Sequence, residues 1–88
     1  MPEPHVASGR VRLRFFARYA DAVGRAEALV TVALPATVAD IVRWARALPG
    51  GEILPERPLA AVNLRHARLD TPVQDGDEVA LLPPLAGG

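Results

Sequence analysis

The chain has 88 residues, of which half are hydrophobic and 23% are charged, a composition typical of one globular domain with a modest core. There is no cysteine, which excludes a disulfide framework, a thiolate metal site and a cysteine nucleophile. The formal net charge is zero, so the composition does not predict a nucleic-acid-binding surface. No stretch approaches the roughly 18 apolar residues of a membrane span, and the N-terminus lacks the pattern of a signal peptide. We therefore expect a cytoplasmic protein that crosses no membrane.

The charged residues are unevenly distributed along the chain. All ten basic residues are arginine. Residues 1–46 carry seven arginines against four acidic residues, and residues 47–88 carry three arginines against six acidic residues. An acidic C-terminal half favours a basic docking partner, although ordinary surface charge explains the same distribution.

Residues 1–9 hold two prolines and a glycine without any periodicity, and we expect a disordered leader there. In residues 11–17 the odd-numbered side chains are apolar and alternate with two arginines and Phe16, which predicts a half-buried strand. The odd-numbered side chains face the core in this interpretation, and Phe16 lies on the opposite face. A short connection over 18–27, with one helical turn, leads to a second strand at 28–34 that pairs back as a hairpin.

Thr37 and Asp40 have the spacing of a capping box, which predicts the start of a helix. The apolar residues that follow recur at intervals of three and four and form one stripe, made of Val38, Ile41, Val42, Ala45 and Leu48. The Pro-Gly-Gly sequence at 49–51 ends the helix, and residues 52–58 form a loop.

Residues 59–64 and 68–71 are predicted as two further strands, with His66 between them. His66 has no second histidine, no cysteine and no carboxylate at ligand spacing, so we predict no metal site and no bound cofactor. A tight turn at 74–77, in which glycine supplies a positive φ, leads to the last strand at 78–82.

In the last strand Val79 and Leu81 are predicted to face the core, whereas Leu82 faces outward. Pro83 and Pro84 lack the N–H groups of a strand ladder, so the strand ends before them and the tail projects.

The chain ends in Leu85, Ala86, Gly87 and Gly88. Because glycine has no Cβ, such an end can pass through a narrow slot and present an unhindered carboxylate to a partner's active site. A frayed terminus without a function is the alternative interpretation.

The predicted order of elements, β-β-α-β-β-β, is typical of an α+β fold with one main helix on one face of a mixed sheet. We divide the chain into a leader at 1–9, a domain at 10–82 and a flexible tail at 83–88. The first and last strands are expected as central neighbours, which places Phe16 and Leu82 together on the uncovered face at the base of the tail. Two apolar side chains beside a projecting end predict a partner-docking patch.

Three stretches and the C-terminus resemble the MoaD family, the ubiquitin-like β-grasp sulfur carriers that form the small subunit of molybdopterin synthase. These stretches are RFFA at 14–17, LAAVN at 59–63 and DGDEVA at 75–80, followed by PPLAGG at 83–88. The likeness covers about residues 10–88. A terminal Gly-Gly is shared with ThiS-type thiamin carriers and with ubiquitin, whereas the DGDEV turn followed by Pro-Pro is more specific to the molybdopterin branch.

This resemblance implies a carrier cycle on Gly88. An E1-like adenylating enzyme (MoeB type) uses ATP to convert the Gly88 carboxylate to an acyl-adenylate, and sulfur from a persulfide donor displaces AMP to leave a thiocarboxylate. The tail then enters the large synthase subunit (MoaE type), in a heterotetramer with two carriers on a large-subunit dimer. There it donates sulfur to cyclic pyranopterin monophosphate, and two such transfers build the dithiolene of molybdopterin. The chain is then a protein co-substrate and not a catalyst.

The resemblance also assigns a site, in which Gly88 carries the sulfur. The expected partner-binding residues are Phe16, His66, Leu82, Pro83, Pro84, Leu85, Ala86 and Gly87. Two of them depart from the family pattern, since Leu82 stands where members carry an aromatic residue and His66 where a larger apolar residue is familiar.

Three other functions remain compatible with the residues. The same thiocarboxylate also suits thiamin synthesis or tRNA thiolation. A ubiquitin-like modifier would instead join Gly88 to lysines of target proteins, although this chain has no lysine with which to extend chains on itself. The third is a plain binding module with an inert tail.

Overall fold

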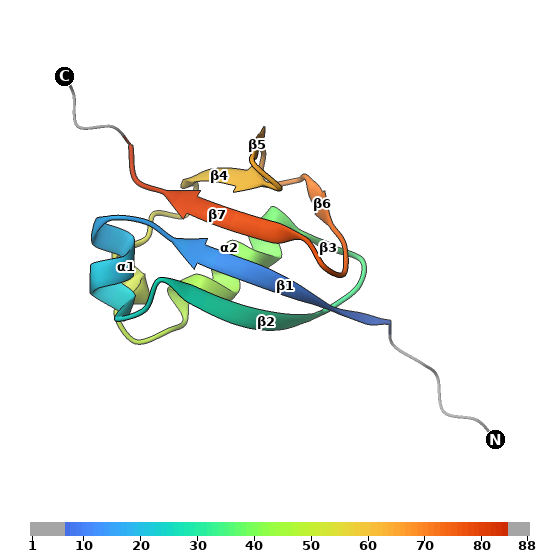
Figure 1. The fold of residues 1–88 in the computed structure, drawn as a ribbon, viewed down its shortest axis with the longest axis horizontal. Coiled ribbons are helices and arrows are strands. Elements are labelled where there is room, and N and C mark those ends of the chain that lie inside the picture. The colour runs from blue at the N-terminus through green and yellow to red at the C-terminus, as the bar shows by residue number, and fades with distance from the viewer. Residues whose placement is uncertain (1–6, 85–88) are drawn as a thin grey trace.

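The structure, a computed structural model, describes residues 7–84 (Figure 1). In chain order its elements are β1 (Ser8–Phe15), α1 (Arg18–Val23), β2 (Glu27–Ala33), β3 (Ala36–Thr37), α2 (Val38–Arg46), the 3-10 turn η1 (Gly51–Ile53), β4 (Leu59–Val62), β5 (Arg65–Ala67), β6 (Pro72–Val73) and β7 (Glu78–Leu82). None of the helices in this range is long and apolar enough to cross a membrane.

Five strands form one mixed sheet in the order β2-β1-β7-β4-β5. The first and last strands, β1 and β7, lie side by side at its centre and run parallel, whereas the other neighbours are antiparallel. Helix α2 lies behind the sheet in Figure 1, and α1 lies at the end where β1 and β7 finish. The predicted α+β fold, with one main helix on one face of a mixed sheet, is confirmed.

The hydrophobic core lies between α2 and one face of the sheet. Alternate residues of the central strands supply the sheet side, and the predicted apolar stripe of α2 supplies the other. The core side chains on these elements are Val11, Leu13, Phe15, Val30, Val38, Ile41, Val42, Ala45, Val79 and Leu81. The predicted facing of Val79 and Leu81 toward the core is confirmed. No helix of residues 7–84 covers the opposite face of the sheet, which we call the open face.

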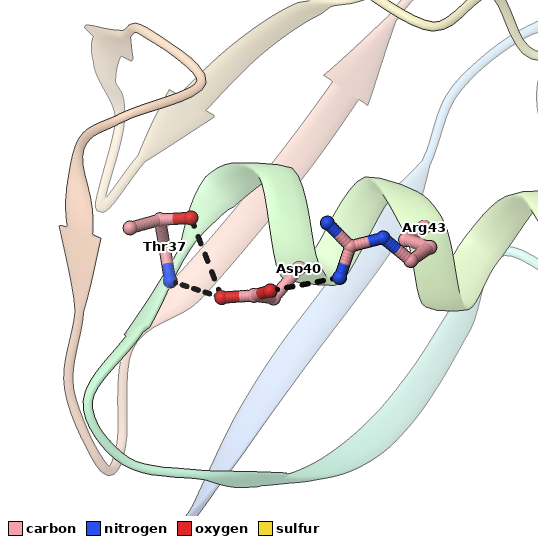
Figure 2. A network of polar contacts seen from close by, with 3 residues as sticks. All are labelled: Thr37, Asp40 and Arg43. Carbon is pink, nitrogen blue, oxygen red and sulfur yellow. Dashed lines mark hydrogen bonds and ion pairs between the residues drawn. The ribbon is translucent and has the colours of Figure 1, made fainter.

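The first turn of α2 is held by Asp40, as the capping-box spacing predicts (Figure 2). The backbone N–H of Thr37 donates to Asp40 Oδ2 over 2.8 Å, and Arg43 Nη1 donates to Oδ1 over 3.0 Å. The hydrogen bond from the Thr37 N–H lowers the pKa of the Asp40 carboxyl, and partial burial opposes this effect less strongly. Asp40 therefore satisfies an N–H that the helix itself leaves without a partner.

Strand β1 begins earlier and ends earlier than predicted. Ser8 pairs with Ala33, so the last two residues of the leader expected at 1–9 belong to the sheet instead. These residues extend the ladder because β2 is long enough to pair with them. At the other end Ala17 has a φ of 51°, which ends the strand and begins the turn into α1. Residues 1–6 lie outside the described range.

The strands after α2 also differ from the prediction. Strand β4 ends at Val62 because Asn63 and Leu64, both with positive φ, form a two-residue turn that closes the hairpin to β5. The short strand predicted at 68–71 was wrong: that segment is a loop between β5 and β6, and β6 pairs with β3 in a separate two-stranded sheet. Neither positive-φ residue is a glycine, so the sequence carried no strong turn signal here.

We predict that Asp40→Ala lowers the free energy of unfolding by about 1 kcal/mol at neutral pH, the usual cost of losing a cap. Because folding lowers the pKa of Asp40, its stabilisation is present above the unfolded pKa of roughly 3.9 and is lost as pH falls through the lower folded value. Urea unfolding of both proteins across this range should show the difference shrinking below about pH 4.

The matched control is Asp70→Ala, which removes an exposed carboxylate that lies 3.7 Å from Arg68. Its effect should stay within about 0.5 kcal/mol at every pH, as for other surface ion pairs. An equal loss of unfolding free energy in both variants would mean that Asp40 stabilises the fold only through general surface charge.

Candidate functional site

The last strand, β7, lies at the centre of the sheet and leads directly to the C-terminal tail. Strand β7 ends at Leu82, after which Pro83 is half-buried and Pro84 is exposed. Neither proline has an N–H for a neighbouring strand, so the ladder stops here as predicted. The expected sulfur-carrying Gly88 and the tail residues Leu85, Ala86 and Gly87 lie outside the described residues, and their roles remain predictions.

Three apolar side chains surround the end of β7 on the open face. Phe15 pairs with Leu81, so Phe16 and Leu82 are the next residues along two adjacent strands and share the face opposite the core. On the other side of β7, Leu82 pairs with Leu59, whose side chain is 49% exposed. Phe16 and Leu82 are themselves half-buried. Phe16, Leu59 and Leu82 thus form an apolar end of the open face, next to the outgoing chain.

The backbone after β1 explains how Phe16 stays on the open face. Ala17 has φ 51° and ψ −130°, and the Tyr19 N–H donates to the Phe16 carbonyl over 3.1 Å. This is the geometry of a tight turn with a positive φ at its first central position, where glycine is preferred. The guanidinium of Arg14 lies 5.2 Å from the centre of the Phe16 ring and packs over it. The turn therefore redirects the chain into α1 directly after Phe16.

Two alanines occupy the middle of the open face. Arg14 pairs with Ala80, Ala80 with Ala61, and Ala61 with His66, so these residues form one row across four strands. His66 is exposed at the far end of this row, on the edge strand β5 and not in a loop. In residues 7–84 no group of three or more His, Cys, Asp or Glu side chains is placed to hold a metal ion.

The structure brings together some of the predicted docking residues and separates others. Phe16, Leu82 and Pro83 meet at the end of the central strands, whereas His66 lies two strands away from β7. Leu59 was not among the predicted site residues. The alternation of β4 contains the signal that would have found it, since Ala60 is buried and its neighbour Leu59 must face the other way.

Together these features define a class of protein. A five-stranded mixed sheet with parallel central strands, one main helix across it and a Gly-Gly sequence at the chain end are the features of a ubiquitin-like β-grasp protein. The model of the ThiS family matches residues 13–88. The chain belongs to this ThiS/MoaD family of β-grasp sulfur carriers, whose members are small and non-catalytic.

Two curated relatives cover nearly the same part of the chain. The molybdopterin synthase sulfur carrier subunit of Escherichia coli is 36% identical in an alignment of 85 positions, which covers 89% of this chain and 99% of the relative. The small archaeal modifier protein 3 of Haloferax volcanii is 32% identical in an alignment of 90 positions, which covers 89% of this chain and 98% of the relative. The chain is thus a sulfur carrier or ubiquitin-like modifier of this family.

Solved structures of similar proteins share the fold. The crystal structure of SAMP1 from Haloferax volcanii matches with a TM-score of 0.79 and 30% identity, over 91% of this chain and all of that chain. A protein-protein complex of subunits 1 and 2 of molybdopterin-converting factor from Helicobacter pylori matches with a TM-score of 0.66 and 24% identity, over 90% of this chain and 99% of that chain. The second structure shows a chain of this fold in a complex.

We predict that Phe16→Glu weakens binding to the protein that receives the tail by at least tenfold, because it places a charge in the apolar end, next to Leu82. Phe16 lies outside the core, so the free energy of unfolding should fall by only about 1 kcal/mol, mainly from its lost packing with Arg14. Titration calorimetry and urea unfolding measure the two effects.

Ile53→Glu is the matched control, since Ile53 is 47% exposed but lies in η1, which contacts the two helices. This variant should bind as the unchanged protein does. Cooperative unfolding of Phe16→Glu under native conditions would show that Phe16 belongs to the core and that the faces of β1 are wrongly assigned.

Proposed function

We propose that this chain is the sulfur-carrier small subunit of molybdopterin synthase and that Gly88 carries the sulfur as a C-terminal thiocarboxylate. The observation that carries this proposal is the 36% identity to the sulfur carrier subunit from Escherichia coli, which extends over almost the whole length of both chains. The DGDEVA, Pro-Pro and Gly-Gly sequences lie within the stretch that the ThiS family model matches.

The chemistry begins with the Gly88 carboxylate, which is a poor electrophile because its oxygen is a poor leaving group. A carboxylate oxygen attacks the α-phosphorus of ATP, pyrophosphate leaves and an acyl-adenylate forms. The terminal sulfur of a persulfide then attacks the acyl carbon, AMP leaves, and an acyl disulfide to the donor forms. A second thiol of the donor or of the adenylating enzyme attacks this disulfide, so that the thiocarboxylate leaves and the two donor sulfurs end as a disulfide. The adenylating enzyme and the sulfur donor supply the reactive groups for both steps, and this chain supplies the acceptor carboxylate.

The second half of the proposed cycle uses the apolar end of the open face. Phe16, Leu59 and Leu82 lie beside the point where the chain leaves β7, so a partner that covers them also receives the tail. The proposed partner is the large synthase subunit, in a heterotetramer of two carriers and a large-subunit dimer. In its pocket the thiocarboxylate sulfur attacks cyclic pyranopterin monophosphate and forms a thioester. Water then cleaves the bond between the Gly88 acyl carbon and the sulfur, which leaves the sulfur on the pterin and returns the Gly88 carboxylate, and two such transfers complete the dithiolene.

A ubiquitin-like modifier is the second candidate function, favoured by the similarity to small archaeal modifier protein 3 and to SAMP1. In that function a lysine amine of a target attacks the activated Gly88, and an isopeptide forms in place of the thiocarboxylate. Since the chain has no lysine, each target lysine would carry a single copy without Lys-linked extension. Thiamin synthesis and tRNA thiolation are further uses of the same thiocarboxylate.

The direct test incubates the purified chain with its E1-like adenylating enzyme, ATP and a persulfide donor, and measures the intact mass. We expect a gain of about 16 Da, the replacement of one oxygen by sulfur, at the C-terminal residue. The thiolated chain is then mixed with a molybdopterin synthase large subunit and cyclic pyranopterin monophosphate, and dithiolene formation is assayed. An unchanged mass with an enzyme that is active on another carrier would contradict the sulfur-carrier function.

Deletion of Gly88 is the matched variant for this experiment. It should abolish the mass gain and leave the unfolding midpoint nearly unchanged, because the core side chains of the described residues 7–84 all lie between Val11 and Leu81. Thiolation without dithiolene formation would retain the carrier but exclude the molybdopterin branch. Conjugates to target proteins in place of sulfur transfer would favour the modifier function.

A further inference from the structure

The open face has a second end, which carries three arginines. Arg10, Arg12 and Arg14 alternate along β1 and therefore all project from the face opposite the core. Arg12 lies four residues before Phe16, so about 13 Å of strand separates this end from the apolar end. The two ends lie on the same strand and cannot move independently.

The acidic groups nearby pair mainly with Arg14. Its guanidinium lies between Glu27 Oε1, at 4.0 Å from Nε, and Glu78 Oε1, at 3.8 Å from Nη1. Although Arg12 pairs with Glu78 in the strand register, the Glu78 carboxylate turns toward Arg14. Within residues 7–84, neither Arg10 nor Arg12 has a carboxylate within ion-pair distance.

A hollow of about 220 Å³ lies between these two arginines. It is lined by Arg10, Arg12, Leu29, Asp75, Gly76 and Glu78. Asp75 Oδ1 accepts the backbone N–H of Arg10 over 2.8 Å, so this carboxylate is directed at the main chain. Leu29, which pairs with Arg12 and is 61% exposed, forms an apolar wall. The lining thus holds two guanidinium groups and two carboxylates, but Glu78 lies within ion-pair distance of Arg14 and Asp75 accepts a main-chain N–H. The guanidinium groups of Arg10 and Arg12 therefore have no ion pair among residues 7–84.

We propose that this hollow receives a carboxylate side chain from the E1-like adenylating enzyme, and that this enzyme's docking surface is acidic where it faces β1. A guanidinium presents several N–H groups in a fixed plane and matches the two oxygens of a carboxylate, so Arg10 and Arg12 are suited to such a contact. The inference rests on the proposed function only as far as the adenylation step, which the sulfur-carrier and modifier functions share.

Contact at both ends of the open face determines the orientation of the carrier. The apolar end alone permits rotation about one contact, whereas a second, charged contact about 13 Å along β1 fixes the direction in which the tail leaves. The charge also increases the rate of encounter, since opposite charges attract before contact. The acidic C-terminal half of the sequence favoured a basic partner, but Arg10 and Arg12 on the open face of β1 favour an acidic one.

The test measures association of the chain with its adenylating enzyme by stopped flow at several salt concentrations. The variant Arg10→Glu with Arg12→Glu should associate at least tenfold more slowly at low salt, and the difference should largely disappear near 0.5 M NaCl, where charges are screened within a few ångströms. Arg12→Lys retains the charge and should keep most of the rate. Arg12→Gln removes the charge without introducing repulsion, so it is the milder variant if the double glutamate variant misfolds. It should slow association by an intermediate amount.

Arg57→Glu with Arg68→Glu is the matched control, since it also reverses two charges. Arg57 and Arg68 line one hollow. Arg68 begins the loop whose Leu69 and Thr71 carbonyls accept the N–H groups of Ala39 and Val38 in the first turn of α2, so this hollow lies toward the helix and away from the open face. Equal slowing by this variant, or no slowing by the β1 variants, would overturn the proposal.

A mass measurement on the same samples distinguishes a failure of the docking proposal from a failure of the sulfur-carrier function. With saturating adenylating enzyme the β1 variants should still gain the sulfur mass, because their tail is intact. If they associate at the normal rate and are thiolated, the acidic docking surface is wrong and the carrier function stands. If the unchanged protein is neither bound nor thiolated, both proposals fail.

Discussion

The parallel pairing of β1 with β7 is the interaction on which the rest of the structure depends. It joins the first and last strands of the domain, and the Arg12 N–H donates to the Asp77 carbonyl over 2.9 Å where the pairing begins. The pairing places Leu13 beside Val79 in the core. Since side chains alternate along a strand, a shift of one residue would turn the core residues to solvent and the apolar end into the core.

This pairing also determines how the chain can act. Because β7 is central and not at an edge, the outgoing chain is flanked by Phe16 on one side and Leu59 on the other. Helix α2 covers the opposite face, so the apolar end and the β1 arginines share the open face. In the proposed function the domain therefore places the end of β7 in a fixed relation to the proposed docking surface, and the proposed chemistry needs nothing more from it.

The strongly periodic elements were predictable from the sequence, and the irregular ones were not. Strand β7 and the core stripe of α2 followed from alternation and helical spacing, and the capping box of Asp40 followed from the residue types. The boundary at Val62 did not, because Asn63 and Leu64 form a positive-φ turn without glycine. The outward Phe16 was predictable, and the alternation of β4 turns Leu59 to the same face. Only the pairing of β4 with β7, which relates residues far apart in the chain, places Leu59 beside Leu82.

The central claim is that the open face and the tail act as one docking surface. Backbone amide NMR signals of the labelled chain, followed during titration with its adenylating enzyme, test this claim most directly. The account predicts that shifts and broadening concentrate on open-face positions of β1, β4 and β7, including Phe16, Leu59 and Leu82, and spare the solvent side of α2. Perturbations centred on α2, with the open face unchanged, would contradict it.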